Sequence, residues 1–355
     1  QLISLKKNAR LSHPPGLSVR PFYTEKSPRK TERLKRFLFT SVRHFGDIRH
    51  DSNTDYLIPY VGHALRRFLS QTRSAVVVST RESLHAAVSR AASAQIQDKV
   101  FFFHSPTGIL EDVFPGAMNE IRALPIPKAV FVTDRNRHSF ASEFGFSHYD
   151  RHLILGNALE STKMIERDEI RETETRDTYR LMYLLRLGPD RADDVTNLIS
   201  FGEHLRDNDI TSIVIDVYGS GQYRDTFLDL VEEGDLEDII VYRGLTRFPT
   251  RLMQDYDAVI DFSRNHSFGM IYIEGVLNGK PVLCMENPGS LEVLDEIPSS
   301  FFHSHEELVS KILALPAISV EELQSNYDKI MARYSRSVVA DKFLAFLDFQ
   351  DDTFE

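Results

Sequence analysis

The segment HSFGMIYIEGVLNGKPVLCMENPG, from His266 to Gly289, carries polar residues on a turn and a helix that a buried strand follows. Ser267, Phe268, Gly269 and Met270 stand where an earlier strand ends and the helix begins. The start of a helix offers free backbone N–H groups and the positive end of its dipole, which suit phosphate oxygens. Glu274 follows about a turn and a half later, where a carboxylate can accept hydrogen bonds from sugar hydroxyls. An ordinary turn with a salt-bridged glutamate fits the same pattern.

Two arginines and two glycines follow earlier strands. RLGPDR places Arg186 and Arg191 directly after the strand YRLMYLLRLG, where they could clamp a diphosphate through bidentate contacts. Two exposed arginines are the simpler interpretation. The next strand ends in VYGSG, and its Gly219 and Gly221 permit close approach of a ligand to the backbone. VYGSG is not G-x-G-x-x-G and has no acidic residue at the usual distance, which argues against a dinucleotide site.

A histidine ends the strand KVFFFHS. His104 could orient a substrate or move a proton there, and a satisfied core histidine is the alternative. The histidines show no metal-ligand spacing such as His-Glu-x-x-His, so we expect no metal. Cys284 is the only cysteine and lies in an apolar run, which predicts a buried thiol and a reducing cytoplasm.

Short β-branched runs alternate with helical stretches from about residue 75 onward, which is typical of parallel sheets with crossover helices. We expect strands near 75–80, 99–105, 128–134 and 152–157, and then, after a polar connection at 158–178, near 179–188, 211–219, 238–244, 257–263 and 281–285. This predicts an α/β protein with two lobes, whose ligands lie beyond the carboxyl ends of the strands, in a cleft between the lobes.

The ends of the chain fit this alternation less well. Aromatic and β-branched residues around Gly46 and Asn53 predict an antiparallel hairpin or meander. We therefore expect a basic arm with a β-rich segment at 1–74, a first Rossmann-like lobe at 75–165, and a second lobe at 166–335. The helix at 336–355 is expected to pack back on the first lobe.

Charge is unevenly distributed along the 355 residues, whose formal net charge is −10. Ten basic and two acidic side chains give residues 1–37 a charge of +8. Such an arm can contact an anionic partner or an acidic membrane surface, or be a solvated leader. The acidic remainder argues against general nucleic-acid binding. No apolar run is long enough to span a bilayer, and the chain opens on Gln1 with no signal-peptide pattern.

Over roughly residues 75–350, these motifs in this order resemble the GT-B glycosyltransferases, specifically the retaining family 4. The resemblance implies that Arg186 and Arg191 bind the donor diphosphate, Arg191 standing where the family usually has Lys. Gly219 and Gly221 look like the family's G-x-G, and His104 looks like its histidine beside the transferred sugar. HSFGMIYIEGVLNGKPV looks like its Glu-x7-Glu motif, which implies that Glu274 binds the donor ribose.

The first glutamate of that motif is replaced by His266, which puts catalysis in doubt because a histidine cannot supply the same negative charge. The unusual front resembles the bacterial adhesin and wall-teichoic-acid glycosyltransferases, a group in which active subunits pair with silent ones. We therefore expect a UDP-sugar hexosyltransferase acting with retention on a protein or cell-surface polymer. The alternatives are a silent subunit that binds the acceptor beside an active partner, and a nucleotide-sugar epimerase. Base, sugar and acceptor stay open.

Overall fold

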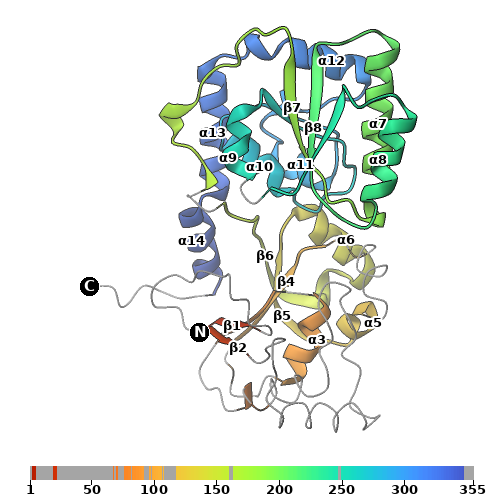
Figure 1. The fold of residues 1–355 in the computed structure, drawn as a ribbon. Helices are drawn as coiled ribbons and strands as arrows, with labels where there is room; N and C mark the ends of the chain where they lie inside the picture. Colours follow the sequence, from red (N-terminus) through yellow and green to blue (C-terminus); the bar gives the residue numbers. More distant parts are fainter. Residues whose placement is uncertain are drawn as a thin grey trace. The chain divides into compact units, whose positions relative to one another are not determined.

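The computed structural model describes residues 2–4, 19–21, 67, 69–70, 76–80, 82–91, 96, 98–105, 107, 117–159, 163–246 and 249–347. The chain divides into two compact units, Gln1–Ile154 and Leu155–Glu355. Each unit contains a parallel β-sheet with helices beside it (Figure 1). The predicted α/β architecture with two parallel-sheet lobes is confirmed.

The first unit is built on a four-stranded sheet in which β3, β4, β5 and β6 pair in parallel in that order. The strands are β3 (Val76–Ser79), β4 (Asp98–Phe103), β5 (Ile126–Phe131) and β6 (Tyr149–Ile154), and the helices are α3 (Glu82–Ala91), α5 (Ala117–Arg122), α6 (Asp134–Phe144) and the 3-10 turn η1 (Phe146–His148). Phe101, Phe103, Phe131 and Phe140 are buried between sheet and helices. Their rings pack in pairs, such as Phe103 and Phe140 with centroids 4.7 Å apart.

The amino-terminal 74 residues are described only in part. A short parallel pair joins β1 (Leu2–Ser4) to β2 (Val19–Pro21), and the sequence did not indicate either strand. The predicted hairpin or meander around Gly46 and Asn53 lies outside the described residues.

The second unit is built on a five-stranded parallel sheet with the order β11-β10-β7-β8-β9. Its strands are β7 (Tyr179–Leu184), β8 (Ile213–Tyr218), β9 (Ile240–Gly244), β10 (Ala258–Asp261) and β11 (Val282–Cys284). Its α-helices are α7 (Ala192–Asp207), α8 (Arg224–Glu233), α9 (Pro249–Leu252), α10 (Met270–Val276), α11 (Pro288–Val293), α12 (His305–Leu313), α13 (Val320–Tyr334) and α14 (Arg336–Phe346). Short 3-10 turns are η3 (Arg167–Glu169), η4 (Pro189–Arg191), η5 (Met253–Asp255), η6 (Pro298–Ser300) and η7 (Leu315–Ala317).

The order of these strands creates a point where the direction of winding reverses. From β7 the chain moves outward through β8 to β9, and then returns to the opposite side of β7 as β10 and β11. Loops that leave β7 and β10 at their carboxyl ends therefore diverge to opposite faces. In open parallel sheets, such a switch point is where ligands bind.

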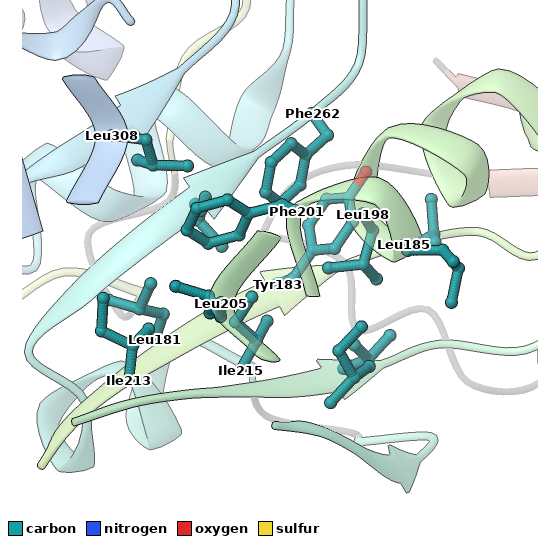
Figure 2. Close-up of a cluster of buried hydrophobic side chains, with 14 of the residues drawn as sticks. Leu181, Tyr183, Leu185, Leu198, Phe201, Leu205, Ile213, Ile215, Phe262 and Leu308 are labelled. Carbon is teal, nitrogen blue, oxygen red and sulfur yellow. The ribbon is translucent and has the colours of Figure 1, made fainter. Parts of the chain in front are cut away.

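Alternating side chains of the second sheet face two different layers. Alternate residues of β7 and β8, such as Leu181, Tyr183 and Ile215, join Leu198 and Phe201 of α7 in one apolar core (Figure 2). The opposite face packs against α10, where a Cβ added to Gly275 would lie 2.5 Å from the Val282 side chain. Because successive side chains of a strand point to opposite faces of the sheet, Asp261 lies on the α10 side.

Polar side chains fix where several helices begin. Thr133, Ser304 and Ser319 each accept a hydrogen bond at 3.2 Å from the backbone N–H three residues later, at the starts of α6, α12 and α13. Such caps satisfy N–H groups that have no partner inside the helix.

The predicted polar connection at 158–178 packs on the second unit. Ile170 is 1 % exposed, and it lies with Ile165 against Gly279, which has a left-handed φ of 68°. These two isoleucines anchor the connection on the second compact unit, which begins at Leu155. The domain boundary after residue 165 stays a prediction. Helix α14 contacts α13. The predicted packing of this helix on the first lobe stays a prediction.

Cys284 is fully buried at the end of β11, which confirms the buried thiol. Across the described helices, none combines the length and the apolar character that crossing a membrane requires.

Candidate functional site

Arg191 connects the two loops that leave the sheet at its switch point. Its guanidinium Nη1 donates hydrogen bonds to the hydroxyl of Ser263 at 2.9 Å and to the carbonyl of Asn265 at 3.4 Å. Ser263 and Asn265 follow β10, whereas Arg191 follows β7. The structure therefore places Arg191 beside the loop that carries His266.

Asp194, in the first turn of α7, is the buried acidic partner of Arg191, whose Nε also lies 3.8 Å from the exposed Asp190 carboxylate. Oδ2 of Asp194 lies 3.2 Å from the guanidinium, and the side chains of Asp194 and Arg191 are 6 % and 18 % exposed. Burial raises the pKa of the Asp194 carboxyl, and the neighbouring Arg191 opposes this shift. Without Arg191, a carboxylate would be left buried and unpaired, so this ion pair fixes the arginine in place.

Arg186 is in a different setting. It forms an ion pair with Asp190 in its own loop, and its side chain is 57 % exposed. Exposed pairs of this kind contribute little to stability. The structure thus brings one of the two predicted arginines, Arg191, to the β10 loop, and leaves Arg186 at the surface.

Asp261, the last residue of β10, is the centre of a buried polar network. Its Oδ2 accepts a hydrogen bond from the Tyr272 hydroxyl at 2.5 Å, and its Oδ1 accepts one from the Ser263 N–H at 3.2 Å. Asn287 Nδ2 donates to the Tyr272 hydroxyl at 2.6 Å and to the Ser263 carbonyl at 2.8 Å. These bonds join the segment after β10 to α10 and to the start of α11.

His266 lies at the edge of this network. Its Nε2 is 3.4 Å from Asp261 Oδ2, and its side chain is 25 % exposed. The imidazole packs edge-on against Tyr272 with ring centroids 5.9 Å apart. Its carbonyl accepts a hydrogen bond from the Gly289 N–H at 2.8 Å. The histidine is therefore oriented by an acid that lies five residues before it in the sequence.

Gly269 begins α10 in a left-handed conformation with a φ of 76°. A Cβ at this position would lie 2.2 Å from the Tyr272 ring, so a larger residue would disturb the network around Asp261. Phe268 is buried and packs edge-on against Tyr334 at 5.4 Å, so its side chain serves packing. Ser267 and Met270 are half-buried.

Glu274 is half-buried on α10. Of the residues that the structure describes, none donates a hydrogen bond to its carboxylate. Burial raises the pKa of the Glu274 carboxyl, and the charge of Lys163 opposes the shift. A desolvated acceptor without a donor is suited to bind hydroxyl groups of a ligand.

Gly219 and Gly221 allow two loops to approach each other. A Cβ on Gly219 would lie 1.7 Å from the Leu185 carbonyl oxygen, and one on Gly221 would lie 1.9 Å from that of Leu187. The Leu187 N–H donates a backbone hydrogen bond to the Ser220 carbonyl at 3.2 Å, which holds the same contact. The chain's own backbone thus accounts for both glycines, because this packing positions the loop that carries the arginines.

His104, at the end of β4, belongs to the first unit. Its backbone N–H donates to Glu82 at 2.5 Å, and the Ser105 N–H donates to the same carboxylate at 3.0 Å. The half-buried imidazole stacks on Phe102 with centroids 5.9 Å apart. In the described ranges, no hydrogen bond reaches this ring. Its position beside a bound sugar stays a prediction.

The satisfied core histidine of this unit is His85, which the sequence did not single out. Its ring nitrogens lie 2.8 Å from the Ser79 hydroxyl and 2.8 Å from the Phe102 carbonyl. Burial lowers the pKa of His85 to about 3. This imidazole is neutral at ordinary pH and is occupied on both sides.

Several polar residues of the site escaped sequence reasoning. Asp194, Asp261, Tyr272 and Asn287 are all buried at or near the switch point. The sequence did contain a signal for Asp261, because it is an acid inside the apolar run AVIDF. A carboxylate in a buried strand is rarely without partners, so this position predicts a buried polar network.

Among the described side chains, no cluster of His, Cys, Asp and Glu could hold a metal ion. A metal-free site stays a prediction.

No protein-family model matches the chain. Over 169 residues, 46 % of this chain, it is 22 % identical to the poly(ribitol-phosphate) alpha-N-acetylglucosaminyltransferase of Staphylococcus aureus (strain COL). That match covers 34 % of the enzyme, so this chain spans about a third of its curated relative.

Solved structures resemble the chain more extensively. TarM has a TM-score of 0.64 and 16 % identity, over 84 % of this chain and 60 % of TarM. HepE from Anabaena, solved with UDP and glucose, has a TM-score of 0.65 and 15 % identity, over 87 % of this chain and 84 % of HepE. The pneumococcal O-GlcNAc transferase GtfA, solved with UDP and GlcNAc, has a TM-score of 0.58 and 13 % identity, over 82 % and 60 % of the two chains. The chain has the fold of these GT-B glycosyltransferases, with two Rossmann-like lobes.

Proposed function

We propose that this protein is a glycosyltransferase that moves a hexose from a UDP-sugar to an acceptor hydroxyl with retention. The observation that carries the proposal is the bridge from Arg191 to Ser263 and Asn265, which holds a cation at the switch point of the second sheet. The GT-B fold and relatives solved with UDP support the same donor class. The acceptor is a protein or a cell-surface polymer.

Each site residue has a distinct role in this proposal. Arg191, with Arg186 from the surface side of the loop, offsets the charge of the leaving diphosphate, assisted by backbone N–H groups of Ser267–Met270. Glu274 accepts hydrogen bonds from the ribose. His266 contacts the transferred hexose and holds it in position for transfer. No metal is required, because the arginines supply the positive charge.

The first test is UDP binding and donor turnover on the purified chain, with UDP-glucose and UDP-N-acetylglucosamine as donors. We expect micromolar UDP binding that Arg191→Ala weakens at least about tenfold, equal to 1.4 kcal/mol. Arg186→Ala, on the exposed arginine, is the matched control and weakens binding less. Equal binding by wild type and Arg191→Ala would contradict the donor site.

Turnover separates the transferase from its alternative. Hydrolysis or transfer by wild type, undiminished by EDTA, supports a metal-free enzyme. Binding without turnover that His266→Glu restores indicates a silent subunit with an intact donor pocket. A GtfA/B complex is among the similar structures and supports testing for a second subunit. Co-purification with an active glycosyltransferase is the observation expected for the silent subunit.

The cytoplasmic location and the role of the basic arm belong to the same proposal. A single buried thiol, Cys284, fits a reducing compartment. Residues 1–37, with a charge of +8, would contact an acidic membrane surface or polymer. Sedimentation with vesicles containing phosphatidylglycerol, compared with phosphatidylcholine vesicles, tests the contact; equal sedimentation with both would contradict it.

A further inference from the structure

The carboxylate of Asp261 is held in place independently of His266. Its side chain is 3 % exposed. Tyr272 donates to Oδ2 at 2.5 Å and the Ser263 N–H donates to Oδ1 at 3.2 Å. Because both oxygens accept a hydrogen bond, the orientation of the carboxylate is fixed before His266 is considered.

His266 turns one ring nitrogen toward this fixed acid. Nε2 lies 3.4 Å from Oδ2, close enough for an N–H group to be attracted to the carboxylate. A neighbouring acceptor determines which nitrogen of a neutral imidazole carries the proton. With the proton on Nε2, the other nitrogen, Nδ1, has a free lone pair and can only accept a hydrogen bond.

The second nitrogen is available for a ligand. Within the described part of the chain, no residue hydrogen-bonds to Nδ1 of His266. A quarter of the side chain is exposed, on the same loop whose Asn265 carbonyl contacts Arg191. An acceptor presented beside the proposed diphosphate site is within reach of the sugar that the diphosphate carries.

We propose that Asp261 is a positioning residue that holds the proton of His266 on Nε2, so that Nδ1 accepts a hydrogen bond from a hydroxyl of the donor hexose. The inference rests on the proposed function. In this arrangement His266 supplies the hydrogen-bond acceptor and Asp261 supplies the carboxylate. The first glutamate of the Glu-x7-Glu motif would combine both in one side chain at position 266. Gly269 has a part in this arrangement, because only a residue without Cβ leaves room for the Tyr272 ring that supports Asp261.

The test combines a spectroscopic signature with donor affinity. In the full chain labelled with ¹⁵N-histidine, long-range ¹H–¹⁵N spectra at pH 8 report which nitrogen of His266 carries the proton, with His266→Gln assigning the signals. We expect the Nε2–H form in wild type and a mixture of forms in Asp261→Asn. Tyr272→Phe, which removes one donor to Asp261 and leaves its carboxylate, is the matched control and keeps the Nε2–H form.

Affinity for the hexose is measured in the same proteins by calorimetry. Asp261→Asn should weaken binding of the UDP-sugar about threefold to tenfold, the range for one lost hydrogen bond, and leave binding of UDP unchanged. An Nδ1–H form in wild type, which needs no folded Asp261 variant, would overturn the inference. Equal UDP-sugar binding by wild type and Asp261→Asn would also overturn it, with the proposed function intact. If wild type binds neither UDP nor UDP-sugar, the proposed function is wrong. The hydrogen bond from the hexose to Nδ1 of His266 is then wrong as well.

Discussion

Arg191 donates a hydrogen bond to the hydroxyl of Ser263 at 2.9 Å, across 72 positions of sequence. The contact ties the loop after β7 to the loop after β10 at the place where the winding of the sheet reverses. The same nitrogen, Nη1, also donates to Oδ2 of Asp194 at 3.2 Å. One side chain therefore links the geometry of the site to the stability of the second unit.

Arg191→Ala is predicted to destabilise the second unit as well as to weaken UDP binding. Removing the guanidinium leaves the Asp194 carboxylate buried without its partner, which costs about 3 kcal/mol in comparable cases. Arg186→Ala breaks only an exposed pair and should cost less than about 1 kcal/mol. Urea unfolding of both variants measures the difference. Equal free energies of unfolding would mean that Asp194 does not depend on Arg191.

Arg191→Ala combined with Asp194→Asn separates the two effects. The double variant should regain stability, because it no longer buries an unpaired charge, while UDP binding stays weak. A double variant as unstable as Arg191→Ala would show that the lost contacts to Ser263 and Asn265 cause the destabilisation.

Gly221→Ala is predicted to be strongly destabilising. Its Cβ would lie 1.9 Å from the Leu187 carbonyl oxygen, which is backbone and cannot rotate away, so the loop that carries Arg186 and Arg191 must move. We expect a loss of more than about 3 kcal/mol in the free energy of unfolding. The control is Gly244→Ala, where the left-handed φ of 74° is strained but no atom lies within 4 Å of the new Cβ. That change should cost about 1–2 kcal/mol. Similar urea midpoints for the two variants would contradict the clash.

The strands were predictable because a parallel strand is buried on both faces and reads as a short apolar run between helical stretches. AVVVST, KVFFFHS and TSIVIDVYG correspond to β3, β4 and β8 within a residue or two. The packing of the polar connection on the second unit was not predictable, because Ile165 and Ile170 are too few to form a periodic pattern. Their burial against Gly279 depends on the tertiary structure.

The candidate site was predictable only where a local motif marks it. The turn before α10 and the loop after β7 were visible from glycines and arginines near strand ends. The pairing of Arg191 with Ser263, and of Asp261 with Tyr272, depends on strand order, because β7 and β10 become neighbours only after β8 and β9 have been placed. A single sequence does not contain that order explicitly.

His85 predicts how the first unit responds to acid. Burial lowers its pKa to about 3, whereas an unfolded histidine binds its proton near the ordinary value of 6.5. Between these values the unfolded state binds more protons, so stability is lost as the pH falls from about 6.5 toward 3. The maximal slope is about 1.4 kcal/mol per pH unit. His85→Gln should show a shallower decline in the free energy of unfolding between pH 6 and 4.

Ser79→Ala is the control for that experiment. It removes one hydrogen-bond partner and lowers stability by about 1 kcal/mol, but keeps the buried imidazole and hence the steep pH dependence. A slope in His85→Gln equal to that of wild type would mean that other groups govern the acid response.

Glu274→Gln is predicted to stabilise the folded chain at neutral pH while weakening UDP-sugar binding. Burial raises the pKa of the Glu274 carboxyl, so the folded state holds a proton that the unfolded state has released, and stability falls as the pH rises through this range. The neutral amide avoids that cost. The advantage of Glu274→Gln should therefore be small at pH 4, grow as the pH rises, and reach a plateau above the folded-state pKa. Urea unfolding at pH 4, 6 and 8 measures this trend. A difference in the free energy of unfolding that is the same at all three pH values would contradict the desolvation of Glu274. UDP-sugar binding as tight as that of wild type would contradict its role as a ligand-binding acceptor. Either result would make Glu274 an ordinary surface acid, not an acceptor kept desolvated at the expense of stability.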